Sequence, residues 1–277
     1  MITDERLNSI FDEVAKRNRT TVSQPRRDIL RESRRRLRVE TDDVAAVHVI
    51  AAASLVDRQP ARSLDVLRQS TSALVGSATG HRLAGYAHVV QHQLDQAKSH
   101  FDQAVRIDPC HCDSWAMLGG IEEKGGLHDQ AIVYYQRALV FDDKNHESSL
   151  ALSRIYSARR NLKDAIGTLR ISLLRDRRNP KLNLALARLL QRRSAVLRRL
   201  RRWNAEARVL REAVDCLRVV IAAAPTSDAC VSLGLLHRQL GQHEDAKCAF
   251  SRAVDLNPQS AVAITHLAGC LVDHGEI

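Results

Sequence analysis

The feature that most constrains this 277-residue chain is its similarity to itself at a shift of 34 residues. Segments related by this shift begin at residues 78, 112, 146 and 180, and the pattern resumes at 227 and 261. Three segments share small and aromatic residues at matching places, which are Gly85, Ala97, Phe101 and Ala104, then Gly119, Ala131, Tyr135 and Ala138, and finally Gly234, Ala246, Phe250 and Ala253. Such a period is typical of one helical or strand unit stacked several times.

The spacing within a segment predicts two antiparallel helices, here named helix A and helix B. Small residues on helix A and on helix B let the two backbones approach closely, and the aromatic residue four places later shares the same face of helix B. Gly126 and Gly241 are suited to close helix A, and Pro109, Pro225 and Pro258 mark places where helix B cannot continue. One such pair cannot bury its apolar face alone, so the pairs must stack.

Composition favours the same conclusion. The chain has only 12 glycines and 6 prolines, and 44% of its residues are hydrophobic but only 4% are aromatic. Good helix formers are abundant, and the short alternating pattern of strands is missing from the sequence. We therefore expect an all-α fold whose core consists mainly of leucine, valine, isoleucine and alanine.

The repeated positions resemble the tetratricopeptide repeat (TPR) family over residues 78–277, about seventy per cent of the chain. The resemblance implies an α–α superhelix, a TPR solenoid of antiparallel helix pairs. We expect arginine-rich N-terminal helices over residues 1–43 and a TPR array over 44–277. The array divides into a degenerate repeat 44–77, repeats 78–111, 112–145 and 146–179, a repeat 180–226 with about fourteen extra residues, a repeat 227–260, and a half repeat or cap 261–277.

Two segments outside the regular pattern are rich in charge. An amphipathic helix containing Leu7, Ile10, Phe11 and Val14 is expected to dock onto the first helices of the array, and an arginine-rich helix should follow Pro25. The extra residues near 192–205 are also arginine-rich and fit a longer helix A. The net charge is +10. For the arginine-rich segment after Pro25 a solvated helix is the favoured explanation over binding of nucleic acid or anionic lipid. For the extra residues near 192–205, contact with an acidic protein surface or phosphates and simple solvation stay equally open.

Resemblance to the family also supplies a candidate binding surface. In TPR arrays, the second, fifth, ninth and twelfth residues of helix A face the concave side and usually contact a partner. The corresponding residues here, with one that lies a step beyond the pattern, are Leu150, Arg154, Lys181, Leu184, Arg188, Arg192, Val231, Leu235 and Arg238. Guanidinium groups bind carboxylates in paired hydrogen bonds while leucine and valine bury apolar side chains, so this surface favours an acidic peptide. Alternatively the arginines are only solvated, because Glu123, Glu147 and Asp228 interrupt the patch.

Other chemistries have weaker support. Arg82, Tyr86 and Met117 stand where one TPR subgroup has the residues that clamp the C-terminal carboxylate of chaperone tails, so such a clamp is not expected. His88 and His92 resemble half of a zinc site, but the sequence offers no evident third ligand. Phosphate-binding loops and nucleophile motifs are missing from the sequence as well. We therefore expect no metal site, no cofactor and no catalytic residues.

These observations predict a non-catalytic interaction scaffold or adaptor that binds an acidic partner segment in the concave groove. Two alternatives stay open: the array is the substrate-recognition or oligomerisation part of a larger enzyme such as a transferase, or it is a basic adaptor for nucleic acid, which is the less favoured of the two. Self-association through the terminal helices is a further expectation. The sequence has no apolar run long enough for a membrane span and no secretory signal at its start, so we expect a cytoplasmic location.

Overall fold

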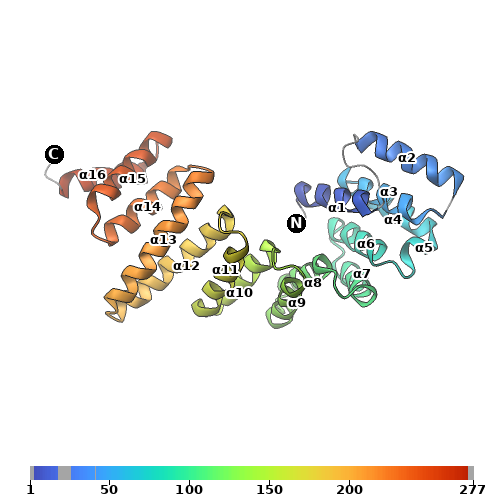
Figure 1. The fold of residues 1–277 in the computed structure, drawn as a ribbon, viewed down its shortest axis with the longest axis horizontal. Helices are drawn as coiled ribbons and strands as arrows, with labels where there is room; N and C mark the ends of the chain where they lie inside the picture. Colours follow the sequence, from blue (N-terminus) through green and yellow to red (C-terminus); the bar gives the residue numbers. More distant parts are fainter. Residues whose placement is uncertain (1–2, 18–25, 41, 274–277) are drawn as a thin grey trace. The chain divides into compact units, whose positions relative to one another are not determined.

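The computed structural model describes residues 3–17, 26–40 and 42–273, and Figure 1 shows their helices in chain order. Every secondary-structure element in these ranges is a helix, which confirms the all-α class. Pro25, which precedes the predicted arginine-rich helix, lies outside the described residues. The chain forms two compact units, unit 1 (Met1–Asp142) and unit 2 (Asp143–Ile277), and each is described by itself.

In its described residues, unit 1 contains three helix pairs, two helices that precede them and one short helix between the first and second pairs. Its helices are α1 (Asp4–Arg17), α2 (Arg26–Val39), α3 (Val44–Val56), α4 (Pro60–Gln69), α5 (Thr71–Leu74), α6 (Ala78–Val90), α7 (Leu94–Ile107), α8 (Cys112–Lys124) and α9 (His128–Phe141). The pairs are α3 with α4, α6 with α7, and α8 with α9, and the first helix of each pair is its helix A. Both α1 and α2 pack against α3, as the docking prediction for the first amphipathic helix required.

Unit 2 contains three helix pairs and a final single helix. Its helices are α10 (His146–Ala158), α11 (Leu162–Arg175), α12 (Pro180–Arg199), α13 (Trp203–Ala223), α14 (Ser227–Gln239), α15 (His243–Leu256) and α16 (Ala261–Asp273). The extra residues of the fourth repeat lengthen both helices of its pair: α12 and α13 have 20 and 21 residues, against 13 and 14 in α10 and α11. The prediction of a longer helix A was therefore correct but incomplete, because helix B gains two turns as well.

The first five A helices start at capping residues that recur with the 34-residue period, whereas Thr226, the N-cap of α14, falls outside it because the fourth repeat is longer. Asp43, Ser77, His111, Asn145 and Asn179 are the N-caps of α3, α6, α8, α10 and α12, and each side chain accepts a hydrogen bond from a backbone N–H of the first turn. The donor–acceptor distances are 3.0–3.3 Å. These caps satisfy N–H groups that have no partner within the helix. A search for identical residues misses this signal, because four residue types fill the same role.

The turn from helix A to helix B also recurs with the period. Arg58, His92, Gly126 and Arg160 lie 34 residues apart and have positive φ angles of 57°, 62°, 77° and 60°, and Gly241 has 74°. A residue in this left-handed conformation ends a helix and favours glycine, which confirms the predicted roles of Gly126 and Gly241. Arg201, between residues 199 and 203 of the fourth pair, has a φ of 55°, so four of these turns place a side chain where glycine fits best.

The seam between paired helices is closely packed around glycine. A Cβ atom added at Gly85 would lie 2.8 Å from the ring of Phe101, and one added at Gly234 would lie 2.6 Å from the ring of Phe250. Both distances are shorter than a van der Waals contact, so the aromatic side chain of helix B occupies the space that a side chain on helix A would need. The close approach predicted from the repeated glycine and aromatic residues is confirmed.

Candidate functional site

We call the side of a unit that carries the second, fifth, ninth and twelfth residues of each helix A its A-helix face. All nine residues of the predicted binding surface lie in unit 2, on α10, α12 and α14. Helix periodicity places the residues of each helix on one side, because neighbours three or four apart share a face. The N-caps Asn145, Asn179 and Thr226 fix where the three helices begin and therefore which residues occupy this face.

The predicted surface combines exposed cations with half-buried apolar side chains. Its exposed members are Arg154, Lys181, Arg188, Arg192 and Arg238, and its half-buried members are Leu150, Leu184 and Leu235. Val231 differs, because it is only 8% exposed and belongs to the core cluster that also contains Phe250. A partner on this face would meet the cations and the edges of the leucines, whereas Val231 mainly supports α14 from beneath.

Apolar packing brings the three helices of this surface together. Leu150 and Leu184 pack against one core cluster, and Leu184 and Leu235 pack against the next. Leu184 of α12 therefore connects the predicted residues of α10 with those of α14. The guanidinium of Arg192 also donates a hydrogen bond to the hydroxyl of Ser157 on α10, which further ties α12 to its neighbour.

The cations differ in what they contact. Among the described residues, the side chains of Lys181, Arg188 and Arg238 form no hydrogen bond or ion pair. Arg192 is engaged with Ser157. Glu147 and Asp228 are exposed at the second positions of α10 and α14, so the positive surface is interrupted at the start of both helices. The arrangement suits carboxylates placed toward the middle and end of each helix A, where the arginines lie.

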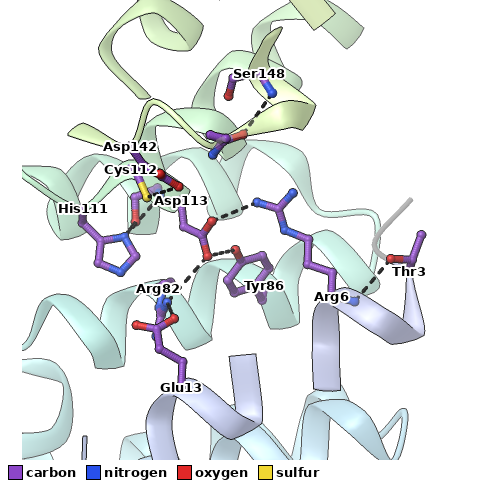
Figure 2. A network of polar contacts seen from close by, with 12 residues as sticks. Thr3, Arg6, Glu13, Arg82, Tyr86, His111, Cys112, Asp113, Asp142 and Ser148 are labelled. Carbon is purple, nitrogen blue, oxygen red and sulfur yellow. Dashed lines mark hydrogen bonds and ion pairs between the residues drawn. The ribbon is translucent and has the colours of Figure 1, made fainter. Parts of the chain in front are cut away.

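In unit 1, helix α1 covers the equivalent positions (Figure 2). Arg82 and Tyr86 occupy the fifth and ninth positions of α6, Asp113 occupies the second position of α8, and both Arg82 and Tyr86 are 0% exposed. Glu13 of α1 accepts a hydrogen bond from Arg82 Nη1 at 2.6 Å. Arg6 of α1 donates to Asp113 Oδ1 at 3.3 Å, and the hydroxyl of Tyr86 donates to Asp113 Oδ2 at 3.4 Å.

The 34-residue pattern does not predict this network. In the sequence, Arg82 and Tyr86 indicate only that a chaperone-tail clamp is not expected. The available signal was the combination of an amphipathic first helix with charged residues at partner-facing positions of the first regular repeat.

Burial and neighbouring charges set the protonation states in this network. Burial lowers the pKa of Arg82, but the Coulombic effects of Glu13, Tyr86 and Asp113 outweigh burial and raise the pKa above its ordinary value. Burial also raises the pKa of Tyr86 and keeps its hydroxyl protonated. For His111, the N-cap of α8, burial and then the positive charge of Arg82 lower the pKa to about 4. These pKa shifts keep Arg82 cationic, Tyr86 a phenol and His111 a neutral imidazole at neutral pH.

Histidines of unit 1 form a separate cluster. His81 Nδ1 and His100 Nδ1 lie 3.1 Å apart, and the His88 ring stacks on the His100 ring with centroids 5.2 Å apart. Across the described residues, no group of three or more histidine, cysteine, aspartate or glutamate side chains is arranged to hold a metal ion. Within the same ranges, helices long and apolar enough to cross a membrane do not occur.

Comparison with known families matches two parts of the chain. Residues 82–146 and 227–260 each match a family model described as tetratricopeptide repeat. The chain is a tetratricopeptide repeat protein. One match runs from within α6 through α9 to the first residue of α10, and the other covers α14 and α15 of unit 2. TPR sequences therefore occur in both units.

Solved structures of other proteins, one of them described as a TPR repeat-containing protein, confirm the solenoid fold. The C-terminal part of a TPR repeat-containing protein from Cytophaga hutchinsonii superposes with a TM-score of 0.68, covering 96% of this chain and 99% of that chain at 12% identity. A structure described as pilF of Pseudomonas aeruginosa gives a TM-score of 0.61, with 82% of this chain and 97% of that chain covered at 14% identity. The Cut9–Hcn1 hetero-tetramer of the APC/C gives 0.57, with 97% and 48% covered at 12% identity. At such identities the likeness concerns the fold alone.

One curated protein is similar in sequence over part of the chain. Anaphase-promoting complex subunit 3 of Schizosaccharomyces pombe is 23% identical over 118 residues, which are 43% of this chain. The aligned residues span 18% of that protein's length. The similarity therefore covers a minority of both chains.

Proposed function

We propose that this TPR protein is a non-catalytic scaffold that binds an acidic segment of a partner protein along the A-helix face of unit 2. Its TPR repeats make it a protein–protein interaction scaffold, and the choice of surface and ligand is our inference. The observation that carries it is the set of exposed cations, including Arg188 and Arg238, beside the half-buried Leu150, Leu184 and Leu235. Arginine binds a carboxylate through two parallel hydrogen bonds, and the leucines bury apolar side chains of the same segment.

We extend the proposal to cofactors, cellular location, domain boundaries and self-association. It requires no cofactor and no metal, and it places the protein in the cytoplasm. The domain boundaries predicted from the repeat period stay part of the proposal. Self-association through α16 is a secondary element, supported by the exposed side chains of Val262, Ile264 and Val272 on that helix.

Selection from an unbiased peptide library displayed on phage tests the ligand class. The full chain should enrich peptides in which aspartate or glutamate alternates with leucine-like residues. Arg188→Glu combined with Arg238→Glu should abolish the enrichment, because the two exposed guanidinium groups become carboxylates. Arg211→Glu combined with Arg252→Glu is the matched control, since it makes the same charge change at exposed positions of α13 and α15.

The results of this selection distinguish a peptide-binding surface from solvated cations and from a nucleic-acid adaptor. If both double variants select the same peptides as the parent, the cations of the A-helix face are only solvated and the proposal fails. If the parent selects no peptide but binds a labelled single-stranded oligonucleotide, with affinity that falls steeply between 50 and 200 mM salt, the protein is a nucleic-acid adaptor instead.

A further inference from the structure

Helix α1 packs on the A-helix face of unit 1 in the way that a helical peptide binds in a groove. Its apolar side consists of Leu7, Ile10, Phe11, Val14 and Ala15, which are only 1–4% exposed and join the core cluster of unit 1. These residues recur at helical spacing, so one stripe of the helix is buried. This is the mode in which an amphipathic helix binds a groove and anchors itself at residues three, four and seven apart.

Charged residues beside the stripe fix the orientation of α1. Glu13 meets Arg82, and Arg6 meets Asp113, so an anion and a cation of the helix each face an opposite charge on the A-helix face. Figure 2 shows both contacts. Arg82 and Asp113 occupy the fifth position of α6 and the second position of α8, which belong to the A-helix face, and both contact a segment of the chain itself.

The contact with Arg82 is incomplete. Its Nη1 donates to Glu13, but its Nε and Nη2 are buried and form no hydrogen bond in the structure. The Glu13 side chain is 36% exposed and so shares its charge with solvent. A buried guanidinium has five N–H donors, and leaving several of them unsatisfied is unfavourable. A carboxylate approaching side-on would satisfy Nε and Nη2 together, so α1 is not the best ligand for this site.

We propose that the A-helix face of unit 1 is a second binding site, that its ligand is an amphipathic helix of a partner protein, and that α1 is an internal occupant which this helix displaces. The partner helix carries a carboxylate toward Arg82 and a cation toward Asp113. This site is distinct from the acidic-segment site of unit 2, because its ligand is helical, apolar on one side and carries both charges.

Competition with α1 makes binding at this site conditional. A tethered helix acts at an effective concentration that reaches the millimolar range for short links. An external helix of equal intrinsic affinity therefore binds weakly to the intact chain and more tightly when α1 is loosened. Arg6→Gln combined with Glu13→Gln loosens α1, because it removes the two charged contacts with the A-helix face and leaves Arg82 and Asp113 in place. The exposed ion pair of Asp4 with Arg58 remains in this variant.

The test uses a labelled peptide with the sequence of residues 3–17 and follows its fluorescence anisotropy with the full chain. The Arg6→Gln/Glu13→Gln variant should bind the peptide at least tenfold more tightly than the parent. A peptide with Glu13→Lys should bind neither protein, since it places an ammonium against Arg82. Circular dichroism checks that both proteins are folded, and Arg6→Lys/Glu13→Asp replaces the first variant if it does not fold.

Hydrogen exchange of the full chain distinguishes this site from that of unit 2. A saturating concentration of the peptide should increase exchange of the α1 amides, and Arg188→Glu/Arg238→Glu should leave this effect unchanged even if the acidic-segment proposal fails. Equal affinity of the peptide for the parent and the loosened variant would overturn the inference. So would binding without exposure of α1, or a loosened variant that light scattering shows to be a dimer, because its α1 would then occupy a second copy.

Discussion

The two units use the same repeat frame but differ in what their A-helix faces contact. In unit 1 the fifth and ninth residues of α6, Arg82 and Tyr86, are fully buried under α1. In unit 2 the ninth residue of α12, Arg188, and the twelfth residue of α14, Arg238, are exposed. The 34-residue period therefore shows which residues can face a partner, but it does not show whether another part of the chain already covers them.

The difference also concerns charge. The face of unit 1 presents a cation and an anion, Arg82 and Asp113, each paired with α1. The face of unit 2 presents mainly cations beside leucines. We expect unit 1 to respond strongly to changes in its buried charges and unit 2 to tolerate equivalent changes.

Reversing the buried charge should have the largest effect. Arg82→Glu places three carboxylates, those of Glu13, Asp113 and the new residue, in one buried network and should destabilise unit 1 by about 3–5 kcal/mol. Arg188→Glu makes the same change on the exposed face and should alter stability by less than about 0.5 kcal/mol. Urea unfolding, monitored in each unit by hydrogen exchange, measures the change in the free energy of unfolding for both variants. Equal effects would show that the two faces do not differ in burial.

Substitution in the helix seam should destabilise both units alike. Gly85→Ala and Gly234→Ala add a Cβ atom 2.8 and 2.6 Å from an aromatic ring, and the resulting overpacking should cost about 1–3 kcal/mol each. Gly167→Ala is the control on α11, where an added Cβ meets nothing within 4 Å and should stabilise the helix by up to about 1 kcal/mol. Thermal unfolding measures all three. A seam variant as stable as the parent would contradict the close packing.

Mild acid should destabilise unit 1. Burial lowers the pKa of His100 and His111 to about 4, and it lowers the pKa of His48 and His81 as well. The unfolded chain takes up protons below pH 6.5 while these folded histidines stay neutral, so stability is lost as pH falls from about 6.5 toward 4.

We expect a loss of about 1–2 kcal/mol over this window, after allowance for solvent screening. His111→Asn should reduce the dependence of stability on pH, because it removes one of the titrating imidazoles. The substitution keeps an N-cap, since Asn145 is the equivalent cap at the start of α10. Unfolding midpoints at pH 7, 6 and 5 measure the effect for unit 1. An unchanged midpoint from pH 7 to 5 would refute the prediction.

The smallest effect should come from the turns between paired helices. Arg160 has φ of 60° where Gly126 occupies the equivalent place in the preceding repeat. Arg160→Gly relieves left-handed strain and should stabilise unit 2 by about 0.5–1 kcal/mol, whereas Gly126→Arg should destabilise unit 1 by a similar amount. Denaturant midpoints test the pair, and shifts of the same sign would contradict the account.

Much of the fold was readable from sequence because it depends on residue size. Gly85 and Phe101 must be small and large for the helices to approach, so they recur and reveal the period. The N-caps were harder to find, because aspartate, serine, histidine and asparagine all supply the same acceptor. The packing of α1 over the A-helix face of unit 1 was the hardest feature to predict. The pairing of Glu13 with Arg82 joins residues 69 apart in sequence, and no local pattern connects them.

Chemical modification of arginine in the full chain tests the contrast between the two faces most directly. Phenylglyoxal treatment followed by peptide mass spectrometry reports the modification rate of each arginine. We predict rapid modification of Arg188 and Arg238, protection of Arg82, and loss of that protection in the Arg6→Gln/Glu13→Gln variant. Modification of Arg82 in the parent protein at the rate of Arg188 would contradict the account, because the A-helix face of unit 1 would then be as accessible as that of unit 2.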